Sequence, residues 1–380
     1  MRNVYINKIS SFLPNQAINN DEIEDVLGYI GGVRSRAKSI VLRNNGIKQR
    51  YYVLDPKTRK PLFTNYEITA NAIRGLLDNN FLLDDIECIA CGTTLPDFIM
   101  PNHALMTQGE LGVKKCEAIA TSGICLSGVT AMKYAYMSIA SNQHENAVCS
   151  GSEAVSLHTR AEMFGQKALD EGDVATKPEL AFGKDFLRWM LSDGAGAMLL
   201  APQPNKDASS LKIEWIDIIS YAGEMPPCMT AGACRDESGD YKPFRHFEPL
   251  EWIEKNIFAI EQDVKLLNEN IIEYTVSKPL KEIAQKRGLK PDDIDWFLPH
   301  YSSEYFKDKV ADGLEKIGFA IPQEKWFTNL TSKGNTGSAS IYIILDEIFN
   351  SDRLKKGEKI LCYVPESGRF STAFILLEVV

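Results

Sequence analysis

The sequence lacks long hydrophobic runs, and it lacks an excess of positive charge. No apolar run approaches the roughly 20 residues that a membrane-spanning helix needs, so the pattern predicts no membrane segment. Lysine and arginine number 42 against 51 acidic residues, which gives a net charge of −9. This acidic balance argues against nucleic acid or an anionic membrane as the main partner.

The chain also lacks the usual signs of export or of a cysteine-based metal site. Its first residues lead into a mixed strand, and its eight cysteines are scattered, which predicts reduced thiols in the cytoplasm. Cys88 and Cys91 have redox-motif spacing, but the apolar run 86–90 reads as a buried strand, so both are expected to pack. Cys228 and Cys234 have no histidines at ligand spacing, so we expect no metal there.

One stretch, 117–151, has the pattern of a nucleophile on a turn between a strand and a helix. Residues 118–120 read as a strand, 121–125 as a small-residue elbow, and 126–141 as a helix by apolar period. Cys125 would lie at the first helical turn, where backbone N–H groups and the helix dipole favour a thiolate. The alternative is a further buried cysteine, since free cysteine is often buried.

The second half of the chain repeats the first in outline. Asp-Asp-Ile followed by an apolar strand occurs at 84–86 and again at 292–294, an offset of 208 residues. The small-residue elbow around Cys125 corresponds to one around Asn335, an offset of 210 residues. A near-constant offset indicates an internal duplication.

The duplication predicts two halves, 1–205 with the cysteine and 206–380 with the asparagine, divided in the polar linker 201–210. Each half alternates strands and helices, which favours layered α/β sheets. If the halves pack about a pseudo-twofold axis, Cys125 and Asn335 meet at the centre. Such convergence favours the catalytic interpretation of Cys125.

His300 follows the predicted strand 295–298, and ligands bind at the carboxyl ends of strands in α/β sheets. Asn335 alone could be a helix N-cap, but in a site its amide would donate to a developing oxyanion. The remaining histidines are interpreted as surface or satisfied core residues: His103, His144, His158 and His246.

These motifs resemble the β-ketoacyl-acyl-carrier-protein synthase III family of the thiolase superfamily, over nearly the whole chain. The family's Cys–His–Asn triad falls on Cys125, His300 and Asn335, in the elbow, in Pro-His and in Gly-Asn-Thr. Asp193-Gly-Ala-Gly-Ala197 and Gly46-Ile47 also match. The resemblance implies a five-layered αβαβα thiolase fold and a homodimer.

The resemblance also implies the chemistry. Cys125 would take an acyl group from a thioester, and a malonyl- or β-ketoacyl-carrier protein would enter through its phosphopantetheine arm. His300 and Asn335 would stabilise the enolate that attacks the acyl-cysteine in a Claisen condensation. The oxyanion hole would be the backbone N–H groups of Cys125 and Gly368, and no metal or organic cofactor would be required.

The chain departs from the family at two places. Fatty-acid-initiating members have a tryptophan and an arginine that help bind coenzyme A, where this chain has Ile40 and Asn44. The usual Phe-Gly-Gly-Gly-Phe becomes Glu366-Ser-Gly-Arg-Phe370. Glu366 could act as a general acid or base, or it could pair with Arg369 and shape the loop.

The loop 366–370 resembles loops of ketosynthase/cyclases in dialkylresorcinol and stilbene pathways. Those enzymes join two β-ketoacyl units and close a cyclohexanedione ring. We therefore expect a specialised condensing enzyme. Fatty-acid initiation, acyl transfer to oxygen or nitrogen, and a non-catalytic partner subunit are the alternatives. Lys307 and Lys309 could dock the carrier protein or form a solvated helix face, and 157–185 and 223–246 are expected to border the acyl tunnel.

Overall fold

The computed structural model describes residues 2–35, 37–164, 187–236 and 238–380. Hydrogen bonds join nine strands into one sheet that has two parts. The first part runs in the order β5 (Glu117–Ser122), β4 (Cys88–Thr93), β6 (Ala147–Glu153), β7 (Gly194–Ala201) and β1 (Tyr5–Phe12). The second part continues as β8 (Leu211–Ser220), β15 (Ser371–Val379), β14 (Lys359–Glu366) and β13 (Trp296–Pro299). The parts meet where Tyr5 and Ile6 of β1 pair with β8.

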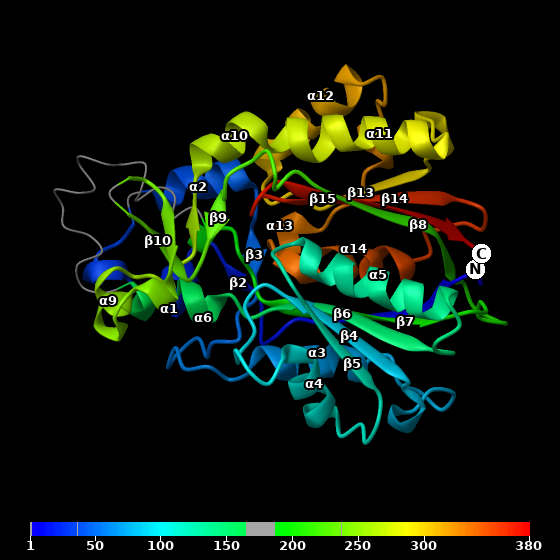
Figure 1. The fold of residues 1–380 in the computed structure, drawn as a ribbon, viewed down its shortest axis with the longest axis horizontal. Coiled ribbons are helices and arrows are strands. Elements are labelled where there is room, and N and C mark those ends of the chain that lie inside the picture. The colour runs from blue at the N-terminus through cyan, green and yellow to red at the C-terminus, as the bar shows by residue number, and fades with distance from the viewer. Residues whose placement is uncertain (1, 36, 165–186, 237) are drawn as a thin grey trace.

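The helices complete five layers, which Figure 1 shows from bottom to top. The lower outer layer contains α3 (Asn65–Arg74) and α4 (His103–Leu111). Between the two parts of the sheet lie α5 (Leu126–Ala140) and α14 (Ser340–Phe349). The upper outer layer contains α10 (Val264–Ile272), α11 (Lys278–Arg287) and α12 (Lys307–Lys316). The predicted αβαβα order is confirmed.

The two parts of the sheet share a pattern of strand pairing. β4 lies parallel to β6 in the first part, and β13 lies parallel to β14 in the second. β6 then pairs antiparallel with β7, as β14 does with β15. The counterpart of β5 is reduced to one parallel bridge between Phe297 and Trp326.

The two central helices approach each other closely, and this contact requires glycine. A Cβ on Gly128 of α5 would lie 2.3 Å from the carbonyl oxygen of Ser338 and 3.0 Å from the Tyr342 ring. The Tyr342 hydroxyl donates a 2.8 Å hydrogen bond to the Gly128 carbonyl. The two elbows that the repeat predicts therefore pack against each other.

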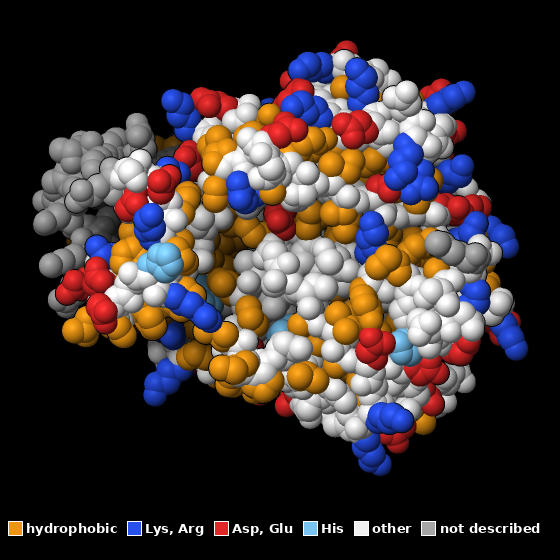
Figure 2. Space-filling model, viewed as in Figure 1, with side chains coloured by type: hydrophobic (Ala, Val, Ile, Leu, Met, Phe, Trp, Pro, Cys, Tyr) orange, Lys and Arg blue, Asp and Glu red, His pale blue; other side chains and the backbone are white. Residues whose placement is uncertain are grey.

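Shorter elements lie mainly at one end of the molecule. These are β2 (Ile18–Asn19), α1 (Ile23–Leu27), α2 (Lys38–Asn45), β3 (Gln49–Arg50), α6 (Ser156–Thr159), β9 (Met229–Thr230), β10 (Ala233–Arg235), β11 (Tyr241–Pro243), α9 (Pro249–Glu254), β12 (Glu261–Gln262) and α13 (Leu330–Lys333). In Figure 2, hydrophobic side chains gather at the end that carries α9, where Leu250 and Ile253 are exposed.

The basic segment before Gly46 forms a regular helix, α2, because its Val41 is buried in a cluster with Ile47 and Tyr52. Within the described residues, no helix is long and apolar enough to cross a membrane.

Candidate active site

A single pocket contains the three residues that the separate motifs predict. Cys125, His300 and Asn335 all line it, and the pocket encloses about 580 Å³ of space, open solvent included. Cys125 immediately precedes α5, His300 follows β13, and Asn335 follows α13, so both halves of the chain build the pocket.

Cys125 occupies the N-cap position of α5, as the sequence predicts. The helix terminus favours a thiolate there, but the surroundings of the thiol oppose it. Burial raises the pKa of the Cys125 thiol, and the carboxylates of Glu366 and Glu153 raise it further. Desolvation and nearby negative charge both disfavour a thiolate, and here they exceed the effect of one helix terminus.

His300 is 3% exposed, and its backbone N–H donates to the carbonyl of Tyr363 at 2.8 Å. Burial lowers the pKa of the ring to about 4. The imidazole is therefore neutral near pH 7, and a neutral ring can donate a hydrogen bond to a carbonyl oxygen without first losing a proton.

Asn335 is 4% exposed, and its backbone is held on both sides. Its N–H donates to the carbonyl of Met190, and its own carbonyl accepts from Ser192. The side-chain Oδ1 accepts from the N–H of Gly337 at 3.0 Å. With that oxygen engaged, the amide offers its Nδ2–H groups as hydrogen-bond donors.

Glu366, at the end of β14, binds the turn that carries Cys125. Its Oε2 accepts from the N–H of Ile124 at 2.8 Å and from the N–H of Leu126 at 3.0 Å. The alternative pairing with Arg369 is wrong, because that guanidinium donates through Nε and Nη2 to the carbonyl of Met225. Among the described residues, no lysine, arginine or histidine forms an ion pair with Glu366.

Gly368 lies against the same turn. A Cβ placed on it would be 2.7 Å from Cδ1 of Ile124, and its carbonyl accepts from the N–H of Cys228 at 2.7 Å. Its neighbour Ser367 lines the pocket. The structure thus places the predicted oxyanion-hole glycine beside the nucleophile's elbow.

The rest of the pocket wall is mostly apolar and comes from elements that the sequence analysis did not assign to a site. Six of the lining residues are Leu187, Met190, Leu267, Ile271, Phe306 and Val310. The apolar period of α10 and α12 was the available signal, but a buried helix face is equally consistent with ordinary core packing. Met229, inside the predicted tunnel range 223–246, lines the pocket. Of the other range, residues 165–185 lie outside the described residues.

The predicted docking lysines lie on α12, beside the lining residues Phe306 and Val310. Lys307 is half-buried, and Nζ of Lys309 donates to the hydroxyl of Tyr305 at 2.7 Å while lying over its ring.

Glu153 connects the two halves behind the pocket. Its Oε1 accepts from the N–H and hydroxyl of Thr94 in one half and from the N–H of Ser338 in the other. Burial raises its pKa to about 7. These contacts indicate a structural role for Glu153.

Comparison with known proteins shows which family the chain resembles. Residues 284–376 match the model of the 3-oxoacyl-[acyl-carrier-protein (ACP)] synthase III C terminal. The whole chain is similar to beta-ketoacyl-[acyl-carrier-protein] synthase III of Limosilactobacillus reuteri, with 26% identity over 378 residues and 99% of each chain covered. The chain is thus similar, over nearly its whole length, to the β-ketoacyl-acyl-carrier-protein synthase III family of the thiolase superfamily.

Solved structures of similar proteins confirm the fold. The chain matches AbyA1, a tetronic acid condensing enzyme, with a TM-score of 0.74, 18% identity and 99% of each chain covered. It matches the synthase III of Pseudomonas aeruginosa PAO1 with a TM-score of 0.70 and 18% identity, covering 99% of this chain and 98% of that one. The predicted thiolase fold and the predicted acyltransferase class are confirmed.

Proposed function

We propose that this protein forms a carbon–carbon bond between two acyl thioesters, with Cys125 as the nucleophile. The observation that carries the proposal is the convergence of Cys125, His300 and Asn335 on one pocket. Each comes from a different segment, and together they supply a nucleophile and two hydrogen-bond donors. An acyltransferase that serves oxygen or nitrogen acceptors would not need a pair of donors for an enolate.

In the first step, the sulfur of Cys125 attacks the carbonyl carbon of an acyl thioester. A new sulfur–carbon bond forms, the carrier's sulfur leaves, and the thiol proton of Cys125 ends on that leaving sulfur. Because the pKa of Cys125 is raised, the proton must leave as the bond forms rather than before it. The N–H groups of Cys125 and Gly368 would hold the tetrahedral oxyanion.

In the second step, a donor thioester forms an enolate beside the acyl-cysteine. His300 and Asn335 donate hydrogen bonds to its thioester oxygen, and the pKa of about 4 keeps His300 neutral for this task. The enolate carbon attacks the acyl carbon, and the sulfur of Cys125 leaves. No residue needs to remove a proton when the donor is a malonyl unit, because loss of CO₂ supplies the electron pair.

Glu366 supports a donor other than malonate. A β-ketoacyl unit that keeps its carbons must lose a proton to a base, and Glu366 places an ion-pair-free carboxylate at the turn around Cys125. We propose that Glu366 is that base and that the enzyme makes a specialised, dialkylresorcinol- or cyclohexanedione-type product.

We propose an acyl carrier protein as the carrier of at least one substrate. Curated relatives carry this partner in their names. Lys307 and Lys309 lie next to two pocket-lining residues and would meet the acidic carrier. Ile40 and Asn44 are exposed on α2 and do not reproduce the family's coenzyme A contacts.

We also propose a homodimer. Among the described residues, β5 ends the sheet and pairs only with β4, so one edge carries free hydrogen-bonding groups. Ile99 and Met100 are 78% and 83% exposed, which is unusual for such side chains away from an interface. Sedimentation velocity tests this proposal: a monomer at micromolar concentration would contradict it.

Intact-mass analysis with acyl-CoA and acyl-carrier-protein thioesters tests the first step. We expect an acyl adduct on the wild type that is absent from Cys125→Ala. Loading only from carrier-protein thioesters supports the specialised reaction, whereas ready loading from short acyl-CoA supports fatty-acid initiation. The absence of any adduct would favour a non-catalytic partner subunit.

Product analysis with Glu366→Gln tests the second step. The amide can still accept from Ile124 and Leu126, so the turn is retained. We expect condensation with β-ketoacyl donors to fall at least tenfold and condensation with malonyl donors to change less. Exposed Glu324→Gln is the control. Equal rates for wild type and Glu366→Gln with β-ketoacyl donors would refute the role of Glu366.

A further inference from the structure

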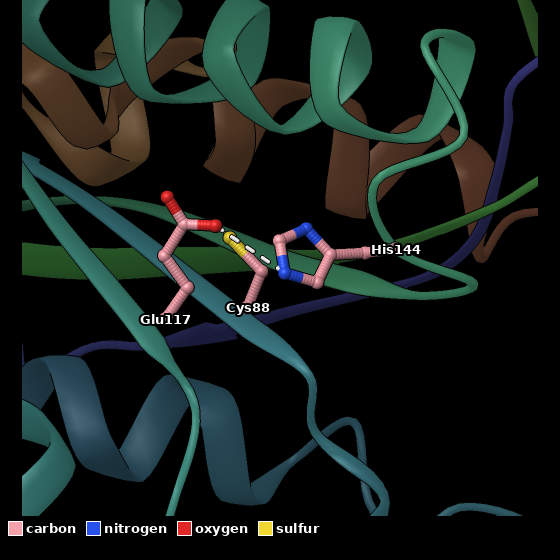
Figure 3. Close-up of side chains that lie close together, drawn as sticks. All are labelled: Cys88, Glu117 and His144. Atoms are coloured by element: carbon pink, nitrogen blue, oxygen red, sulfur yellow. Dashed lines mark ion pairs between the residues drawn. The ribbon is translucent and has the colours of Figure 1, made fainter.

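The geometry points to a second site, a metal-binding site formed by Cys88, Glu117 and His144. We propose that it binds Zn²⁺ and that the bound ion stabilises the fold by joining three segments. Figure 3 shows the three side chains converging from β4, from β5 and from the loop before β6. One ligand atom of each lies within 4.8 Å of the others. The set offers sulfur, nitrogen and oxygen, the three donors that Zn²⁺ takes in proteins.

The site is separate from the catalytic pocket. Cys88 and Glu117 begin their strands, whereas the pocket lies beyond the opposite ends, where Ser122 leads to Cys125. Five residues of strand correspond to about 17 Å. No residue of this cluster lines the pocket, so metal binding here need not involve the acyl chemistry.

The ligand atoms already face one another. Nε2 of His144 lies 3.3 Å from Oε2 of Glu117, and dashes mark this pair in Figure 3. Cys88 is fully buried beneath them, whereas the Glu117 side chain is 39% exposed. A metal ion could enter from the Glu117 side, and water could fill the fourth position of a tetrahedral site.

Helix α5 orients two of the ligands. Oγ of Ser138 lies 2.5 Å from Nδ1 of His144, and the hydroxyl of Tyr134 donates to Oε1 of Glu117. The hydroxyl of Ser138 can accept from Nδ1–H, a tautomer that leaves the Nε2 lone pair for a metal. Hydrogen bonds that hold the outer atoms of ligands are typical of metal sites.

The loop that carries His144 is also held in place. Nη2 of Arg2 donates to the carbonyl of His144 at 2.7 Å, and the N–H of Glu145 donates to Oε2 of Glu87 at 2.7 Å. These contacts place the imidazole before any ion arrives, so binding requires little reorganisation. Without a metal, the contact between Glu117 and His144 near the surface would contribute little stability.

The bound ion would join three segments that are adjacent in the sheet but 29 and 27 residues apart in sequence, at 88, 117 and 144. Binding requires the thiolate of Cys88, so the thiol proton is released to solvent as the sulfur–metal bond forms. No redox partner is needed. The expected consequences are a metal-dependent rise in melting temperature and the uptake of one equivalent of Zn²⁺.

Cobalt titration of the full-length, chelator-treated protein tests the site. We expect a near-ultraviolet thiolate-to-Co²⁺ absorption that saturates at one equivalent and disappears when Zn²⁺ is added. Cys88→Ser should remove this band, whereas Cys125→Ser and Cys234→Ser should keep it. No band in the wild type, or a band that Cys88→Ser retains, would overturn the proposal.

His144→Gln covers the case in which Cys88→Ser does not fold, because His144 is near the surface. We expect its affinity for Zn²⁺ to fall at least tenfold and the metal-dependent rise in melting temperature to disappear. The matched control is exposed His246→Gln, which should bind as the wild type does. Equal Zn²⁺ affinities for the wild type and His144→Gln would reject this ligand set.

Discussion

The carboxylate of Glu366 accepts hydrogen bonds from the backbone N–H groups of Ile124 and Leu126, the two neighbours of Cys125 in the chain. A negative charge thus lies where the helix terminus would otherwise favour a thiolate. Together with burial, it raises the pKa of the nucleophile. The site therefore holds a protonated cysteine beside a carboxylate.

Removing that charge should make Cys125 more acidic. In Glu366→Gln the pKa of Cys125 should fall, because a like charge no longer opposes the thiolate, and each unit of fall increases the thiolate fraction tenfold below the pKa. Alkylation by iodoacetamide, followed by intact mass from pH 6 to 9, should be several-fold faster than in the wild type. Glu324→Gln should alkylate as the wild type does, and slower alkylation of Glu366→Gln would contradict the electrostatic account.

The roles of His300 and Asn335 can be separated from that of Cys125. His300→Ala and Asn335→Ala should still load an acyl group on Cys125, because the donors serve the enolate of the second step. The rate of condensation should fall by roughly 10²-fold or more, which is the typical effect of removing one preorganised donor to an oxyanion. Intact mass measures loading and product analysis measures condensation. A variant that loses both in parallel would place that residue in the first step.

Buried histidines should destabilise the protein in acid. Burial lowers the pKa of His103 to about 4 from the ordinary 6.5. As the pH falls from 6.5 to 4, the unfolded chain binds a proton that the folded chain does not, so the free energy of unfolding falls. This residue accounts for at most about 3 kcal/mol of that loss.

His103→Gln should therefore lose less stability than the wild type between pH 6.5 and 4, as measured by urea denaturation. Exposed His246→Gln should follow the wild type. Parallel curves for the wild type and His103→Gln would show that the ring is not held neutral.

Two helical glycines should respond oppositely to alanine. In Gly128→Ala the new methyl would overlap the backbone oxygen of Ser338, so we expect a loss of about 3 kcal/mol, the cost of a severe overpacking. Gly109, in α4, has no atom within 4 Å of such a methyl, so Gly109→Ala should gain about 0.5–1 kcal/mol. Denaturant unfolding measures both, and a tolerated Gly128→Ala would mean that the central helices can separate.

The sequence by itself determined the layered fold and the meeting of Cys125 with Asn335. Hydrophobic period marks strands and helices locally, and a duplication repeats that pattern at a constant offset, so both can be read without coordinates. His300 could be found because ligands gather at strand ends. The helix α2 was missed because its few apolar residues become informative only when their packing partners are known.

Only the tertiary structure decided the electrostatics and the long-range contacts. Residues 124 and 366 share a hydrogen bond across 242 positions, and no local pattern encodes that approach. The protonation state of Cys125 follows from burial and two carboxylates, which outweigh the helix terminus visible in the sequence. The cluster of Cys88, Glu117 and His144 likewise exists only because parallel strands bring distant residues to one end of a sheet.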